Sequence, residues 1–95
     1  MKLKENSRMI YDYVLAHEDE DITAKDIAEA TGLTSRQVNG SITMAFVRHR
    51  DEEKNEVPLM ERVEAEVEES DGTHSKVKLI RLTEAGRNIE IEDAD

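Results

Sequence analysis

The chain has 95 residues, of which 37% are apolar and 3% aromatic, and its formal net charge at pH 7 is −10. This length allows one small core of aliphatic side chains, and the absence of cysteine excludes disulfides, thiolate metal ligands and cysteine nucleophiles. No apolar run is long enough to span a membrane. We therefore expect residues 1–95 to form a single cytoplasmic domain with no membrane partner.

The charge is distributed unevenly along the chain. Residues 31–50 contain three arginines and no acidic residue, a net charge of +3, and residues 72–87 also sum to +3. Residues 51–71, in contrast, sum to −8. Since a strongly acidic protein as a whole is repelled by nucleic acid, contact with a polyanion would have to use the two basic windows.

The first predicted helix covers about Ser7 to His17. Ser7 is a favourable N-cap because its hydroxyl can accept a hydrogen bond from a free amide of the first turn. One helical face is formed by residues that recur at the right spacing, namely Ile10, Tyr13, Val14 and His17. The acidic run 18–21 should end this helix, because neighbouring like charges favour a solvated loop.

A second helix is predicted to begin after Ile22. Thr23 and Asp26 fit a capping box in which Asp replaces the usual Glu or Gln, and a carboxylate is favourable near a helix N-terminus. The helix should end at Gly32, because glycine adopts the left-handed conformation that often follows the last helical turn.

A third helix follows at once, because Thr34 and Gln37 fit another capping box. It should cover about residues 35–48 and direct one apolar face into the core, formed by Val38, Ile42, Ala45 and Phe46. Two short helices joined by a glycine-containing turn define a helix-turn-helix, here residues 23–50.

Beyond residue 50 the apolar period changes from that of a helix to that of a strand. After a charged connection, apolar residues alternate with glutamates from Val63 to Glu68, which predicts a strand with one solvated face. The turn sequence Ser70-Asp71-Gly72-Thr73 predicts a hairpin. On the returning strand apolar residues alternate with Lys76 and Lys78 up to Leu79, and the strand continues into Ile80 and Leu82.

The C-terminal region has weaker signals. Thr83 is a possible cap for a short helix over about residues 84–91, and Gly86 should weaken that helix. The acidic tail, residues 88–95, is expected to fray.

These elements resemble the winged helix-turn-helix DNA-binding superfamily, most closely its MarR-like branch. Residues 23–38 are similar to the family's paired helices, with Ala28 where the helices cross and Gly32 in the turn. The segment Leu82-Thr83-Glu84-Ala85-Gly86-Arg87 resembles the L-T-x-x-G-R run that follows the wing in that family. The resemblance covers about residues 7–87. It implies an α+β winged-helix fold: a three-helix helix-turn-helix core, a two-stranded β-hairpin wing and a short C-terminal helix.

In such a fold the third helix would enter the major groove of DNA, while the wing, residues 71–77, would contact the backbone or the minor groove. Arginine can bond guanine, Gln and Asn can pair with adenine, and hydroxyls reach phosphates. Gly40 would allow a close approach to the duplex, although glycine costs a helix about 1 kcal/mol relative to alanine. The remaining candidate contacts are Ser35, Arg36, Gln37, Asn39, Thr43, Arg48, Arg50, Thr73, His74 and Lys76.

Each assignment has a structural alternative. The polar helix residues could form an ordinary exposed face. Arg48 and Arg50, with His49 between them, could interact favourably with the negative C-terminal end of the helix dipole. The wing residues could lie on a solvated hairpin tip. The histidines His17, His49 and His74 fall on separate elements without ligand spacing, so we expect no metal site, no cofactor and no enzymatic activity.

The leading hypothesis is a sequence-specific double-stranded DNA-binding protein, a small transcriptional regulator that acts as a monomer, as a homodimer or with a protein partner. A second hypothesis is a winged-helix protein-interaction module, because a fold does not determine a function. Its acidic strand would attract a basic partner through Glu64, Glu66, Glu68 and Glu69. A third hypothesis, an acidic mimic of DNA, is opposed by the two basic windows.

Overall fold

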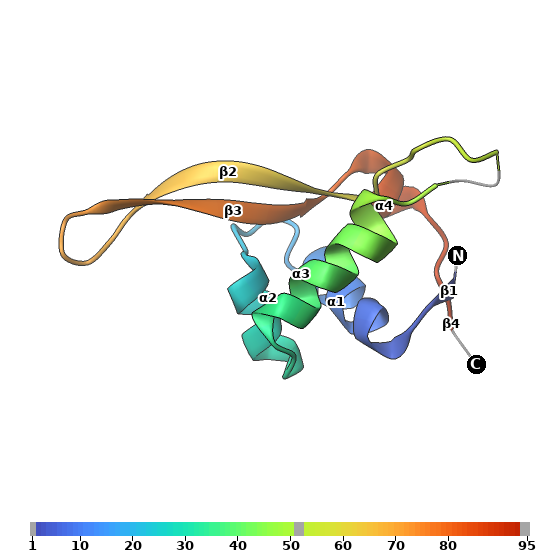
Figure 1. Ribbon diagram of the computed structural model, residues 1–95, viewed down its shortest axis with the longest axis horizontal. Helices are drawn as coiled ribbons and strands as arrows, with labels where there is room; N and C mark the ends of the chain where they lie inside the picture. The colour runs from blue at the N-terminus through green and yellow to red at the C-terminus, as the bar shows by residue number, and fades with distance from the viewer. Residues whose placement is uncertain (1, 51–52, 94–95) are drawn as a thin grey trace.

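The computed structural model describes residues 2–50 and 53–93 and has an α+β architecture in which an antiparallel hairpin follows the helices. The helices gather at one end, and the hairpin extends away from them along the 48 Å long axis of the molecule (Figure 1). The elements in chain order are β1 (Lys2–Leu3), α1 (Glu5–Ala16), α2 (Ala24–Thr31), α3 (Ser35–Ser41), the π-helix η1 (Ile42–Val47), β2 (Met60–Glu68), β3 (His74–Leu82), α4 (Glu84–Asn88) and β4 (Glu92–Asp93).

One cluster of buried apolar side chains joins the helices to the base of the hairpin. Ile10 of α1, Ile27 of α2 and Phe46 of η1 are each 0% exposed. Met60 and Ile80 extend this cluster from the two strands. Burial of such side chains contributes about 1.5–3 kcal/mol each, so this cluster dominates the stability of the described part of the chain.

The start of α1 differs from the prediction. The prediction that Ser7 caps this helix is wrong, because Lys4 is the N-cap residue and its side chain makes no capping hydrogen bond. Leu3 is 4% exposed and lies in β1, immediately before the helix. The helix therefore begins next to the buried Leu3, and its N-cap lies three residues before the predicted one. The acidic residues 18–21 lie outside the helix, as predicted.

Both predicted capping boxes are confirmed. The Thr23 hydroxyl accepts a hydrogen bond from the Asp26 amide at 3.3 Å, and the Asp26 carboxylate accepts one from the Thr23 amide at 3.0 Å. Thr34 and Gln37 make the equivalent bonds at 3.1 and 2.9 Å. Gly32 has a φ of 80°, so the left-handed end of α2 is confirmed as well. Local chemistry therefore determines where α2 ends and α3 begins.

The third helix does not keep α-helical geometry to its end. α3 stops at Ser41 and continues without a break into η1, in which the last hydrogen bond runs from the Arg48 amide to the Thr43 carbonyl at 3.0 Å. The amide of Leu59 bonds the Phe46 carbonyl at 2.8 Å. The final turn is thus shaped partly by a tertiary hydrogen bond, which no local sequence pattern reveals. We call the continuous element the α3–η1 helix.

The predicted inner face of this helix is confirmed in large part. Val38, Ile42 and Phe46 are each 0% exposed, and Ala45 is partly buried against the same cluster. Met44 is 70% exposed on the opposite side. The face that points away from the core is therefore polar except at this methionine.

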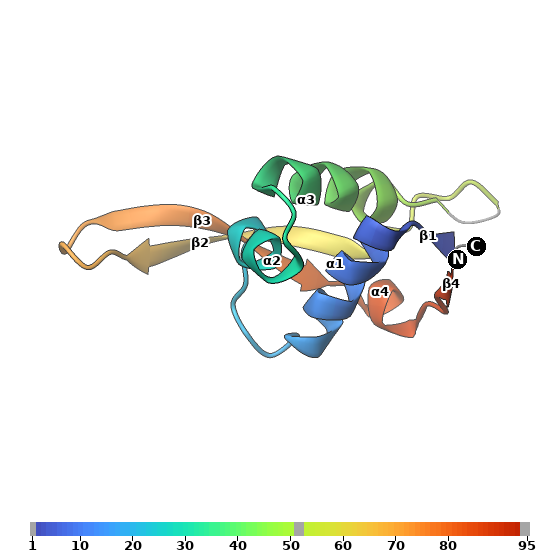
Figure 2. The same cartoon turned by 90° about the horizontal axis from the view of Figure 1, so that it is seen from below.

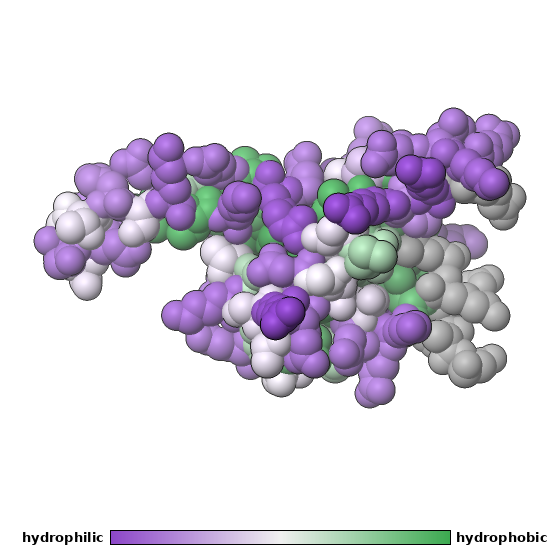
Figure 3. Space-filling view, viewed as in Figure 1, coloured by the Kyte–Doolittle hydropathy of each residue, from purple (hydrophilic) through white to green (hydrophobic). Residues whose placement is uncertain are grey.

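β2 and β3 are paired over nine residues each, from Met60 opposite Leu82 to Glu68 opposite His74. Val63 and Val67, predicted to lie on the buried face of the strand, are 37% and 38% exposed. The prediction that these valines are buried is therefore wrong: they alternate with Arg62, which bonds Thr43 of the third helix, so they lie on the face of the hairpin that points away from this helix. The outer half of the hairpin also extends beyond the helices (Figure 2). Apolar surface is visible along the hairpin as a result (Figure 3).

The C-terminal segment contains a shorter helix than predicted and an additional strand. α4 ends at Asn88 instead of residue 91, and β4 then pairs in parallel with β1, which places Glu92 opposite Lys2. The structure gives Glu92 and Asp93 a backbone pairing that the sequence did not predict. Fraying of the tail stays a prediction, and residues 94–95 lie outside the described residues. The pairing depends on β1 and β4 lying side by side, as Figure 1 shows, so the composition of the tail alone does not reveal it.

Gly86 is required by close packing, in contrast to the prediction that it only weakens the last helix. A Cβ at this position would lie 2.0 Å from the carbonyl oxygen of Leu59. Thr83 caps α4 as predicted, accepting a hydrogen bond from the Gly86 amide at 3.1 Å. The buried Tyr11 hydroxyl donates to the Gly86 carbonyl at 2.8 Å, and burial raises the pKa of this phenol. The glycine thus lets α4 pack directly on the main chain before β2.

Replacing Gly86 with alanine should lower the free energy of unfolding by at least about 1–3 kcal/mol, because the new Cβ overlaps backbone atoms and no side-chain rotation relieves the overlap. Urea denaturation followed by circular dichroism measures the effect. Gly40→Ala is the matched control, since a Cβ there meets no heavy atom within 4 Å. A Gly86→Ala protein as stable as the wild type would contradict this packing.

Candidate nucleic-acid interface

Five of the predicted contact residues of the third helix lie on its exposed outward face. Thr43 is half-buried, Arg48 follows the last turn, and Arg50 lies beyond it, where its backbone pairs with that of Glu56. The structure therefore brings together the contact residues of α3 itself, all of which are exposed: Ser35, Arg36, Gln37, Asn39 and Gly40. The exposed Met44 lies four residues beyond Gly40, a helical spacing that would have identified it.

Arg62 of β2 belongs to this face, although sequence reasoning missed it. One guanidinium nitrogen donates to the Asn39 carbonyl at 3.1 Å, to the Asn39 Oδ1 at 3.4 Å and to the Thr43 hydroxyl at 3.0 Å. In the sequence Arg62 falls inside the acidic window. Its role becomes visible only from the strand register, which places it opposite Ile80 on the side of the hairpin that faces the helix.

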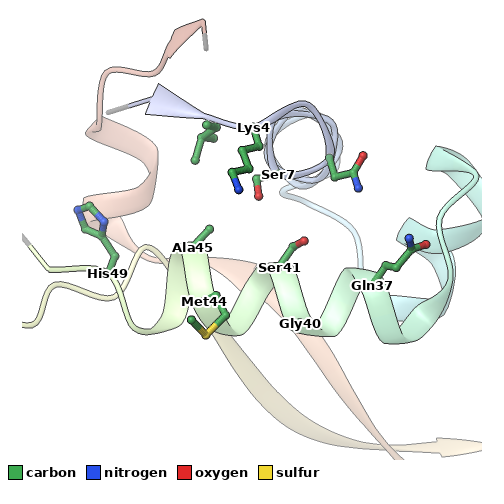
Figure 4. Close-up of a pocket in the computed structure, with 10 residues that line it drawn as sticks. Lys4, Ser7, Gln37, Gly40, Ser41, Met44, Ala45 and His49 are labelled. Carbon is green, nitrogen blue, oxygen red and sulfur yellow. The ribbon is translucent and has the colours of Figure 1, made fainter. Parts of the chain in front are cut away.

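A first open groove lies between the beginning of α1 and the α3–η1 helix. Its volume is about 670 Å³. We call it the α1-side groove. Lys4 and Ser7 lie across it from Ser41 and Ala45 (Figure 4). Gln37, Gly40, Met44 and His49 also line it, so this groove borders the outward face of the helix along most of its length.

A second open groove, of about 410 Å³, lies on the other side of α3, between this helix, the beginning of α2 and the hairpin. We call it the hairpin-side groove. Three cationic side chains line it, namely Lys25, Arg62 and Lys78, together with the polar residues Thr23, Ser35 and Asn39. The two grooves thus run along opposite sides of the same helix.

Both grooves lack acidic residues among their described lining residues. None of the ten residues of the α1-side groove and none of the nine residues of the hairpin-side groove is Asp or Glu. In the whole chain 23 of 95 residues are acidic. Among the residues that the structure describes, the outward face of the helix and the linings of the two grooves therefore carry no carboxylate, and we call these residues together the acid-free surface.

The second basic window, residues 72–87, contributes less free positive charge than its sequence indicates. Lys78 has no carboxylate within 4.0 Å in the described part of the chain, and its cross-strand partner Glu64 pairs with a different lysine. The other three cations of the window all form ion pairs: Lys76 with Glu64 at 3.5 Å, Arg81 with Asp21 at 3.0 Å, and Arg87 with Glu18.

The predicted wing contacts lie on the outer part of the hairpin, away from the helices (Figure 1). The Thr73 hydroxyl donates to the Asp71 carboxylate at 2.6 Å, and this bond lowers the pKa of Asp71. His74 Nδ1 lies 3.3 Å from Glu66 Oε1. Thr73, His74 and Lys76 each contact a carboxylate, and none of them lines either groove. The predicted wing contacts therefore do not belong to the acid-free surface.

Comparison of the chain with protein-family models, curated proteins and solved structures finds no match. Within residues 2–50 and 53–93, no helix is both long and apolar enough to cross a membrane. The same described residues contain no group of three or more His, Cys, Asp or Glu side chains placed to hold a metal ion. Inference about function therefore rests on the geometry and charge of the acid-free surface.

In the described part of the chain, no close packing requires a glycine at position 40, and glycine lowers the stability of a helix relative to alanine. We expect Gly40→Ala to stabilise the protein by about 1 kcal/mol, because alanine favours a helix and its Cβ meets no heavy atom within 4 Å. For a domain of this size the melting temperature should rise by about 4–8 °C in a calorimetric scan. A fall in melting temperature would show that Gly40 has a structural role.

Proposed function

We propose that this protein is a winged-helix, sequence-specific double-stranded DNA-binding protein and a small transcriptional regulator. The observation that carries the proposal is the acid-free surface, which interrupts a chain of net charge −10. Carboxylates on a DNA-binding face would repel phosphates, and cations there release counterions from the duplex. The order of helices followed by an antiparallel hairpin is compatible with a winged helix.

The position of the two grooves supports insertion of the α3–η1 helix into the major groove. The major groove of B-DNA is about 12 Å wide and admits an α-helix, and a phosphate backbone runs along each of its edges. A helix in this position has one backbone on either side. The hairpin-side groove offers Lys25, Arg62 and Lys78 to one backbone, and the α1-side groove offers Lys4 and His49 to the other.

The geometry gives less support to an interaction module that binds a basic partner through β2. Glu64 lies 3.5 Å from Lys76, so a cation from β3 offsets part of the negative charge that would attract such a partner, and Glu66 lies 3.3 Å from the His74 ring. DNA is therefore the partner that we propose. Because a single copy offers few phosphate contacts, a homodimer on two half-sites would bind DNA more tightly than a monomer.

Removing a groove cation tests this proposal. Lys25→Gln and Lys78→Gln should each weaken binding to all duplexes by a similar factor, because phosphate contacts carry no sequence information. Each should also reduce the slope of log K against log salt concentration by about 0.9, the contribution of one phosphate contact. Fluorescence anisotropy with a duplex selected from a random pool, measured between about 50 and 200 mM salt, gives both quantities.

Lys54→Gln is the matched control, because it removes the same charge from an exposed position outside both grooves. It should leave the slope unchanged. An equal fall in slope for Lys54→Gln would show that only net charge matters, and an absence of binding to any duplex at low salt would contradict the proposed function itself.

A further inference from the structure

The hydrogen bonds of Gln37 decide which of its polar atoms can reach a ligand. Its Oε1 accepts the Thr34 amide at 2.9 Å, as the capping box requires. Turning the side-chain amide over would direct its NH₂ group at another N–H donor, so the cap fixes the orientation. The side chain therefore offers the two N–H groups of Nε2 to the exterior and directs its oxygen back to the helix start.

Arg62 fixes Asn39 and Thr43 in the same way. The guanidinium donates to Asn39 Oδ1 at 3.4 Å and to the Thr43 hydroxyl oxygen at 3.0 Å. A guanidinium has donors only, so the opposite amide orientation at Asn39 would bring two donors together. Asn39 therefore directs Oδ1 at the guanidinium and keeps both Nδ2 donors available, and Thr43 keeps the hydrogen of its hydroxyl group and one acceptor lone pair.

The outward face of α3 is therefore rich in hydrogen-bond donors, although the Ser35 hydroxyl on this face can also accept. Arg36 contributes donors only, and Gln37, Asn39 and Thr43 each have an acceptor occupied within the protein. In the major groove guanine presents two acceptors, N7 and O6. Adenine presents an acceptor and a donor, thymine an acceptor and a methyl group, and cytosine a donor. Guanine is the base whose edge matches a donor surface best.

Resting on the proposed DNA-binding function, we propose that the α3–η1 helix selects guanine bases in the major groove of its target, and that Arg62 is a positioning residue for this preference. This revises the expectation that Gln37 and Asn39 pair with adenine. A bidentate pair with adenine needs the oxygen and the nitrogen of one amide aimed at the same base, whereas here each oxygen is bonded inside the protein.

Selection from a pool of random duplexes tests the preference with the wild-type protein. The enriched sites should contain guanines on the strand that the helix reads. Replacing one of them with 7-deazaguanine, which keeps base pairing but lacks the N7 acceptor, should weaken binding about 5- to 150-fold. Adenines at the read positions, or no effect of 7-deazaguanine, would overturn the inference and leave DNA binding intact. If no sequence is enriched, the proposed function fails and the inference fails with it.

The role of Arg62 is tested by two substitutions. Arg62→Met keeps an apolar stem but frees Asn39 Oδ1, so the preference at one base position should move from guanine towards adenine in the same selection. Arg62→Lys keeps donors within reach of both acceptors and should retain guanine. A methionine variant that keeps guanine at every position, or a lysine variant that loses it as methionine does, would overturn the positioning role. Circular dichroism spectra establish that both variants are folded before selection.

Discussion

The hydrogen bonds of Leu59 hold the helix, the hairpin and the C-terminal segment in one arrangement. Its amide bonds the Phe46 carbonyl at the end of η1, and its carbonyl accepts the Thr83 amide at 3.0 Å, where β3 leads into α4. Its side chain is 1% exposed, and Gly86 packs against its carbonyl. Because this buried residue connects η1 to the hairpin base, it fixes the distance across which Arg62 reaches α3.

This arrangement brings the acidic loop after α1 next to two cations of the second basic window. The acidic loop after α1 lies against Arg81 of β3 and Arg87 of α4, which form ion pairs with Asp21 and Glu18. These exposed pairs contribute little stability each, about 0–1 kcal/mol. They nevertheless occupy two cations of the second basic window with carboxylates that lie outside both grooves. Free positive charge thus remains near α3, while negative charge is held elsewhere.

Sequence reasoning succeeded where the signal was local. Each capping box, begun by Thr23 or Thr34, lies within four consecutive residues, and Gly32 marks the end of α2 by itself. The positions of α2 and α3 were therefore predictable. Arg62 belongs to the site only because β2 and α3 pack together, and the π-helical turn and β4 also depend on distant contacts. The candidate site was therefore predictable along the helix, but its hairpin side was not.

The capping box at the start of α3 connects folding to recognition. Thr34 needs an acceptor for its free amide, and the side chain that supplies it, Gln37, also lies on the outward face. A glutamine elsewhere on this face would be free to turn either edge of its amide towards a base, whereas Gln37 is committed to one edge by the cap. The same bond that stabilises the beginning of the helix therefore limits what the helix can read, and Arg62 extends that limit to Asn39 from the strand beside it.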